Sequence, residues 1–190
     1  MTNDIKEKYV TIGRRGERFT PPPEEETAYF TALGRAIVLW GKFETQLDNY
    51  FLILRRANGA DAILPFDPPF NLQGKNGKNK LIRKCLRKVP GLKSIEEPLL
   101  GLLDDVVEAA QIRHIIVHGR WSGFQDREIL TGTFTKPKEG NDITRQKWHY
   151  IDLPSLEGME TKFNDLCVRL SSITSMTLSL LPPPRMEKLD

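Results

Sequence analysis

The chain has 190 residues, of which 39% are hydrophobic and 28% charged, and its formal net charge is +3. This length suffices for one domain with a sizeable core and is short for two. The small net charge does not by itself indicate a class of partner. No apolar run approaches the roughly 18 residues that a membrane-spanning helix needs, so we expect no membrane contact.

The first residues and the two cysteines favour a reducing compartment. Residues 1–20 are polar and lack the apolar core of a secretory signal. Cys85 and Cys167 lie far apart and match neither a metal-binding spacing nor a CxxC motif. We therefore expect a cytoplasmic protein that needs no metal and no cofactor.

A polar segment at 1–23 ends in three prolines, and a long helix is predicted directly after it. Proline is tolerated at a helix start, and Glu24–Glu26 suit the positive end of the helix dipole. A structured loop at 57–74, rich in proline, follows the helix. The helix is predicted from apolar residues that recur every three or four positions: Phe30, Leu33, Ile37, Trp40, Phe43, Leu47, Tyr50 and Leu54.

Three further helices are predicted. A basic helix spans about 76–88, and Pro90-Gly91 ends it. A strongly apolar helix runs from about Glu96 to His118; a capping box at Ser94 or a cap at Glu97 before proline can begin it. The last helix spans about 155–181, and a tail at 182–190 follows.

Between the third and fourth helices the apolar pattern changes to that of strands. Residues 121–124, 129–135 and 146–151 alternate or cluster β-branched and aromatic side chains. We expect two or three short antiparallel strands there. The predicted fold is mainly α: a single domain at 24–181, built as a four-helix antiparallel bundle with a small antiparallel β-insert at 119–151.

Arg113 and His118, near the end of the third helix, are the best candidates for a chemical site. Five positions correspond to about 500° of helical rotation, which leaves the two side chains about 140° apart. We therefore expect them to cooperate only if the helix unwinds at Gly119 or if a second subunit contributes its own copies.

The chemistry of this pair suits phosphate. Arginine stays charged and binds phosphate oxygens with its fork of donors, and histidine exchanges a proton near neutral pH. RNA carries its own nucleophile, the 2′-OH, so a base and a cation can suffice without a metal. The alternative is structural: histidine is common before a helix-ending glycine, and arginine can simply pair with an acid.

The same stretch resembles the signature of HEPN (higher eukaryotes and prokaryotes nucleotide-binding) domains. In that signature an arginine, a polar residue and, after four to six intervening residues, a histidine lie late in an apolar helix. Here polar His114 follows Arg113, and four residues intervene before His118. The ending His118-Gly119-Arg120-Trp121 resembles uncharacterised bacterial members, and Trp40-Gly41-Lys42-Phe43-Glu44 resembles the pattern of their first helix.

The resemblance implies a homodimeric, metal-independent endoribonuclease, a toxin or defence component for which a protein antitoxin is a possible partner. It implies that Arg113 binds phosphate and His118 transfers the proton. His114 is a possible orienting residue, and Glu44 a possible support for Arg113. Toxins of the branch that pairs with a nucleotidyltransferase carry tyrosine two residues after the histidine. Arg120 stands there, which argues against control by tyrosine modification.

Six cations are candidates for RNA binding, although a solvated helix face is an equally good interpretation of the basic helix. The alternative function is a non-catalytic HEPN-like helical dimer that binds RNA, nucleotide or a protein partner. A third possibility is a plain helical interaction domain. The candidate cations are Lys78, Lys80, Arg83, Lys84, Arg87 and Arg120.

Overall fold

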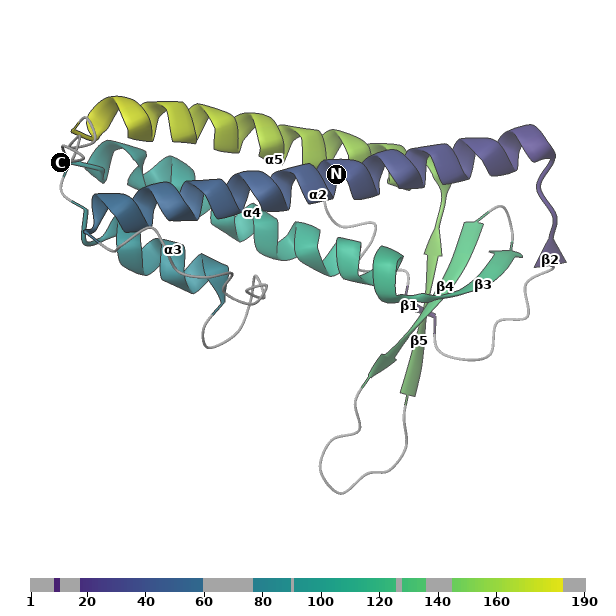
Figure 1. Cartoon of the computed structure of the whole chain (residues 1–190). Helices are drawn as coiled ribbons and strands as arrows, with labels where there is room; N and C mark the ends of the chain where they lie inside the picture. Colours follow the sequence, from purple (N-terminus) through teal and green to yellow (C-terminus); the bar gives the residue numbers. More distant parts are fainter. Residues whose placement is uncertain are drawn as a thin grey trace, which may run out of the picture. The chain divides into compact units, whose positions relative to one another are not determined.

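A computed structural model shows a mainly helical chain with a small antiparallel sheet, as the sequence predicts. The residues that the structure describes are 9–10, 18–59, 77–89, 91–125, 128–135 and 145–182. In chain order the elements are β1 (Tyr9–Val10), β2 (Arg18–Phe19), α2 (Pro23–Ala57), α3 (Lys78–Leu86), α4 (Lys93–His118), β3 (Arg120–Gln125), β4 (Glu128–Thr135), β5 (Arg145–Ile151) and α5 (Leu153–Leu180) (Figure 1).

The chain divides into two compact units, and each is described by itself. The sheet unit consists of Met1–Trp40 and Ala109–Asn164, and the helical unit of Gly41–Glu108 and Asp165–Asp190. The described strands all belong to the sheet unit, and α3 lies wholly in the helical unit. Because α2, α4 and α5 each cross the division, every one of these helices contributes one segment to each unit.

The sheet has five antiparallel strands in the order β1-β5-β4-β3-β2 (Figure 1). The three central strands lie where the sequence predicts the β-insert. The expectation of two or three strands in this insert is confirmed by β3, β4 and β5. The polar segment at 1–23 adds both edges of the sheet, which the sequence did not predict: β1 pairs with β5, and β2 pairs with β3. Each edge strand is two residues long, too short for an alternating pattern to reveal it.

The helical unit buries the apolar faces that the periodicity predicts. On α2, Phe43, Leu47, Tyr50 and Leu54 are fully buried, at 0% exposure. The hydroxyl of Tyr50 lies 3.1 Å from Oγ1 of Thr177 on α5, which itself donates to the carbonyl of Ile173. Thr177 has a single hydroxyl hydrogen, so Tyr50 is the donor in the first of these bonds.

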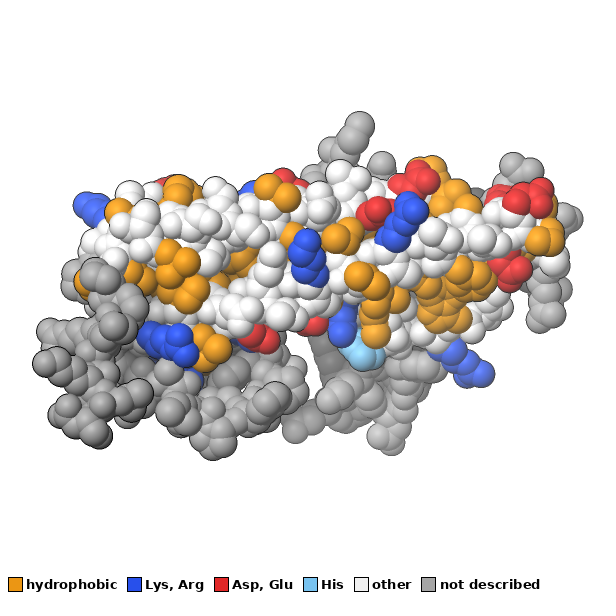
Figure 2. Space-filling view, turned by 45° about the horizontal axis from the view of Figure 1, so that its top comes forward, with side chains coloured by type: hydrophobic (Ala, Val, Ile, Leu, Met, Phe, Trp, Pro, Cys, Tyr) orange, Lys and Arg blue, Asp and Glu red, His pale blue; other side chains and the backbone are white. Residues whose placement is uncertain are grey.

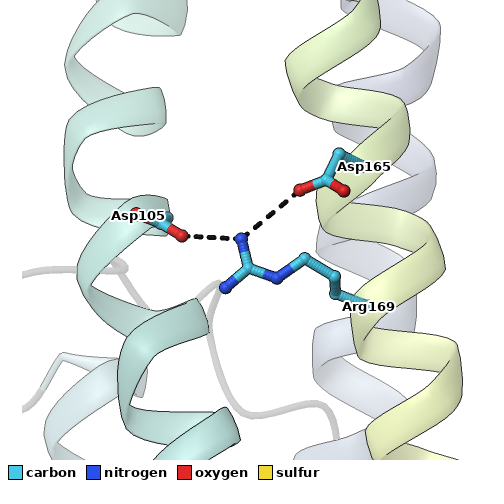
Figure 3. Close-up of polar contacts among 3 residues, drawn as sticks. All are labelled: Asp105, Asp165 and Arg169. Atoms are coloured by element: carbon cyan, nitrogen blue, oxygen red, sulfur yellow. Dashed lines mark hydrogen bonds and ion pairs between the residues drawn. The ribbon is translucent and has the colours of Figure 1, made fainter. Parts of the chain in front are cut away.

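An exposed ion pair network also joins two helices of this unit. Nη1 of Arg169 on α5 donates to Oδ2 of Asp105 on α4 at 2.6 Å and to Oδ2 of Asp165, one turn earlier on α5, at 3.3 Å (Figure 3). The hydrogen bond to Asp105 is the main cause that raises the pKa of Arg169, with a smaller contribution from Asp165.

Helix boundaries agree with the predicted ranges except at the start of α4. This helix begins at Lys93, and Pro98 lies inside it, so neither predicted cap is its start. Proline at this position removes the backbone hydrogen bond to the carbonyl of Ser94, four residues earlier. The predicted loop from residue 60 to 74 and the tail from residue 183 lie outside the described residues. No helix in the described part is both long and apolar enough to cross a membrane.

Candidate functional site

The candidate site lies where α4 ends and β3 begins, within the sheet unit. The helix ends at His118, and the N–H of Gly119 still donates to the carbonyl of Ile115 at 3.0 Å. Strand β3 then starts at Arg120. A single residue therefore separates a helix of 26 residues from a sheet strand, and His118 is held between two regular elements.

Arg113 and His118 meet directly within one chain. Nη1 of Arg113 lies 2.9 Å from Nε2 of His118. The expectation that the helix must unwind or a second subunit must intervene is therefore wrong. Helical rotation fixes the directions of Cα–Cβ bonds only, and the long arginine side chain spans the remaining angle along the helix surface.

This hydrogen bond defines the tautomer of His118. A guanidinium has five N–H donors and no acceptor, so Arg113 must be the donor and Nε2 of His118 the acceptor. In this arrangement Nε2 of His118 presents its lone pair, and the ring hydrogen sits on Nδ1. A neutral imidazole with a lone pair on Nε2 is the form that a general base requires.

His114 completes a compact group with this pair. Its ring centroid lies 5.0 Å from that of His118, one helical turn away. Both histidines are exposed and Arg113 is half-buried, with its Nε buried and unpaired among the described residues. Figure 2 shows a histidine side chain at the surface, with a cationic side chain and apolar side chains beside it. The group can thus offer one fixed cation and two titratable rings to a ligand in solvent.

Gly119 is required by a close approach between α4 and the sheet. A Cβ added there would lie closer than 3.0 Å both to Oγ1 of Thr131 on β4 and to the carbonyl of Ile115. Thr131 is fully buried, so it has no room to move away. The glycine of the His-Gly-Arg-Trp sequence therefore lets the sheet touch the helix end beside His118.

Trp121 also contacts the end of α4. Its Nε1–H donates to the carbonyl of Ile116 at 3.2 Å, which satisfies one of the free carbonyls of the last helical turn. Its ring stacks against Phe30 of α2, with centroids 6.2 Å apart. The tryptophan of the sequence motif thus has a structural role in positioning His118, which sequence reasoning missed.

A β-bulge makes this aromatic packing possible. The register of β3 on β4 shifts between Trp121 and Gly123, and Gly123 has a φ of 110°. Without the extra residue, Trp121 and Phe124 would point to opposite faces, since strand side chains alternate. With it they oppose Thr131 and Ile129, and both rings pack on Phe30.

The two remaining candidates near the motif have different positions. Arg120 is exposed at the start of β3, in the same unit as Arg113 and His118. Glu44 is half-buried on α2 in the helical unit, whereas Arg113 and His118 belong to the sheet unit. Its role as a support for Arg113 remains a prediction.

The candidate RNA-binding cations of α3 separate into two groups. Lys78 is 5% exposed and forms an ion pair with Asp48 of α2. Nη2 of Arg83 lies 2.5 Å from Oδ1 of Asp104 on α4. These two charges are matched inside the helical unit, whereas Lys80, Lys84 and Arg87 are exposed. A sequence signal for Lys78 exists, because it shares the spacing of four with buried Ile82 and Leu86.

Within the described part of the chain, no three His, Cys, Asp or Glu side chains converge as a metal site would require. None of the protein-family models, curated proteins or solved structures compared with the chain matches it. The case for a function therefore depends on the side chains at the end of α4.

Proposed function

We propose that this protein is a metal-independent endoribonuclease of HEPN type, with Arg113 and His118 as its catalytic residues. The observation that carries the proposal is the 2.9 Å hydrogen bond between Arg113 and a solvent-exposed His118. A cation and a neutral imidazole in contact are the two groups that transesterification of RNA needs.

In the proposed reaction the RNA phosphate takes the place of His118 as the partner of the guanidinium. Nε2 of His118 then accepts the proton of the 2′-OH, and the 2′ oxygen forms a bond to phosphorus. The bond from phosphorus to the 5′ oxygen breaks, and that oxygen takes the proton that His118 has accepted. His114, whose ring lies 5.0 Å from that of His118, orients the pair. The products are a 2′,3′-cyclic phosphate and a 5′-hydroxyl end, and Arg113 stabilises the charge on the phosphorane oxygens.

The homodimer that the resemblance implies is part of this proposal. Its support is the set of apolar side chains left exposed in the sheet unit, among them Ile37 at 42%, Val38 at 70% and Val117 at 39%. Val117 directly precedes His118, so a second copy bound there would exclude water from the site. A protein antitoxin is the other possible partner for this surface.

The test is cleavage of a single-stranded RNA in the presence of a chelator. We expect wild type to cut and His118→Ala to lose the activity, by a factor of about 10² to 10⁴ for a general base. Arg113→Lys should cut far more slowly than wild type, because lysine keeps the charge without the planar fork. Gln111→Ala, at an exposed position of the same helix, is the matched control and should cut normally.

A non-catalytic HEPN-like dimer is the second candidate function. It is favoured by Gly119 and Trp121, two of the four residues of the His-Gly-Arg-Trp sequence, because both have structural roles that require no catalysis. RNA bound without cleavage by wild type and His118→Ala alike would support this candidate. Equal cleavage by both proteins would contradict the proposed catalytic role of His118.

A further inference from the structure

The exposed cations of α3 lie on one face of the helix. From Lys80, the positions of Lys84 and Arg87 are rotated so that all three fall within an arc of about 60°, and Lys88 follows in the turn directly after them. All four are exposed. Arg87 caps the helix with helical angles, φ −65° and ψ −19°, so the stripe continues past the last helical residue. It extends over about 12 Å at 1.5 Å per residue.

The opposite face of α3 is buried in the interior of the helical unit. Ile82 is 0% exposed and Leu86 is 4% exposed, and the ion pair of Lys78 lies on the same buried side. Because Arg83 is matched by Asp104, the stripe is what remains of the basic helix for a partner outside the protein. The helix has no acid of its own.

The end of α2 also carries cations. Arg55 and Arg56 form its basic last turn. Burial raises the pKa of the Cys85 thiol on α3, while Arg55, Lys88 and Lys84 each lower it. Arg55 itself is half-buried, and its guanidinium carbon lies 5.7 Å from the centroid of the Phe51 ring, so it is not counted in the exposed row of cations.

We infer that Lys80, Lys84, Arg87 and Lys88 form a docking surface for the phosphate backbone of single-stranded nucleic acid. Charge complementarity selects this ligand, since a polyanion neutralises a row of cations and releases its counterions. The surface has no residue in common with the Arg113–His118 pair, and the inference holds whether or not that pair cuts RNA.

A membrane surface fits these observations less well. A helix that binds lipid inserts its apolar side chains between the head groups. The apolar side chains of α3 are instead buried within the protein, and none of the exposed large hydrophobic residues lies on this helix. Base-specific recognition is not expected either, because the stripe consists of cations alone.

The test is the salt dependence of binding to a fluorescent, fully 2′-O-methylated RNA oligonucleotide, which 2′-OH chemistry cannot cleave. Anisotropy titrations from 50 to 200 mM KCl compare wild type with Lys84→Gln/Lys88→Gln. Two lost phosphate contacts should reduce the slope of log K against log salt by about 1.4, at roughly 0.7 for each phosphate of a single strand. Over that range wild type should therefore lose about sevenfold more affinity than the variant.

Two variants serve as controls. Lys84→Arg/Lys88→Arg keeps both charges and should keep the wild-type slope. Arg35→Gln/Lys42→Gln removes two charges from exposed positions of α2 and should leave the slope unchanged; the ion pair of Arg35 with Glu160 is long, at 4.0 Å, and exposed. A wild-type slope in the Lys84→Gln/Lys88→Gln protein would overturn the inference, as would an equal loss in the α2 control.

A second measurement uses Cys85 as a reporter. The bound oligonucleotide should slow alkylation of half-buried Cys85 by iodoacetamide in the wild-type protein. Polyglutamate of the same charge should compete poorly with the oligonucleotide. An alkylation rate that does not change when the oligonucleotide binds would place the oligonucleotide away from Cys85 and overturn the inference. Displacement of the oligonucleotide by polyglutamate at equal concentration would also overturn it and would indicate an acidic protein partner.

Discussion

Replacing Gly119 with alanine tests whether the approach of the sheet to the end of α4 holds the candidate site. The added Cβ would lie closer than 3.0 Å to two atoms, Oγ1 of Thr131 and the carbonyl oxygen of Ile115. The first belongs to a fully buried, β-branched side chain and the second to the backbone of the last helical turn. Neither can move aside without displacing β4 or α4.

The magnitude follows from the cost of overpacking. Extra methyl groups in a packed interior cost about 1–3 kcal/mol, and two rigid neighbours place Gly119→Ala at the upper end. A loss of about 3 kcal/mol should lower the melting temperature by roughly 6–12 °C in a chain of this size. His118 precedes the glycine, so RNA cleavage should fall as well if the proposed function is correct.

Thermal unfolding followed by circular dichroism provides the assay, and Gly101→Ala provides the control. Gly101 lies on the same helix with nothing within 4 Å of an added Cβ. Alanine there should stabilise by about 0.5–1 kcal/mol, since glycine is the poorer residue inside a helix. Glycine to alanine should thus destabilise the protein at position 119 and stabilise it at position 101. A Gly119→Ala protein that melts at or above the wild-type temperature would refute the reasoning.

Three further predictions concern the helical unit. Thr177→Val should lower the free energy of unfolding by about 1–3 kcal/mol, because it leaves the buried hydroxyl of Tyr50 without an acceptor. Tyr50→Phe should lower it by only about 1 kcal/mol. Urea unfolding of both variants checks this order. Burial raises the pKa of Tyr50 above its ordinary value of 10.0, so the folded state keeps a proton that the unfolded state loses. Stability should therefore fall as pH rises above about 10, and less steeply in Tyr50→Phe; equal melting curves against pH for both proteins would contradict it. Arg169→Gln should lower the free energy of unfolding by at most about 1 kcal/mol, because its ion pairs with Asp105 and Asp165 are partly exposed, and this loss should shrink in 1 M salt. A larger loss that does not depend on salt would show a different role for the arginine.

The long helices and the central strands were predictable because each repeats its pattern many times. On α2, buried side chains recur at every third or fourth position from Tyr29 to Leu54, which marks the helix. The predicted stripe is nevertheless wrong in its first part, because Phe30 and Ile37 are exposed and the neighbouring Tyr29 and Ala36 are buried instead. Strands β3, β4 and β5 are six to eight residues long, which is enough for alternation to be visible. The two edge strands have two residues each and pair with partners more than 100 positions away, and nothing local marks them.

The candidate site was predictable in its residues but not in its geometry. The identities and spacing of Arg113 and His118 predicted phosphate chemistry, whereas their contact depends on the length of one side chain, which a helical rotation angle ignores. The aromatic contacts of Trp121 depend on a bulge at the next residue. Alternation along the sequence assigns the wrong face to a strand after a bulge, so the packing on Phe30 was not visible before the register was known.

The geometry gives the β-insert a specific part in the proposed chemistry. The helix end that carries His118 is held by the close approach of Thr131 at Gly119 and by the hydrogen bond from Trp121 to Ile116. Both restraints come from the sheet, and both act within two residues of the histidine. A minimal helical bundle would leave the last turn of α4 free to fray. A general base must stay within hydrogen-bond distance of the proton that it accepts. We therefore expect the sheet to raise the rate of RNA cleavage only by holding His118 in position.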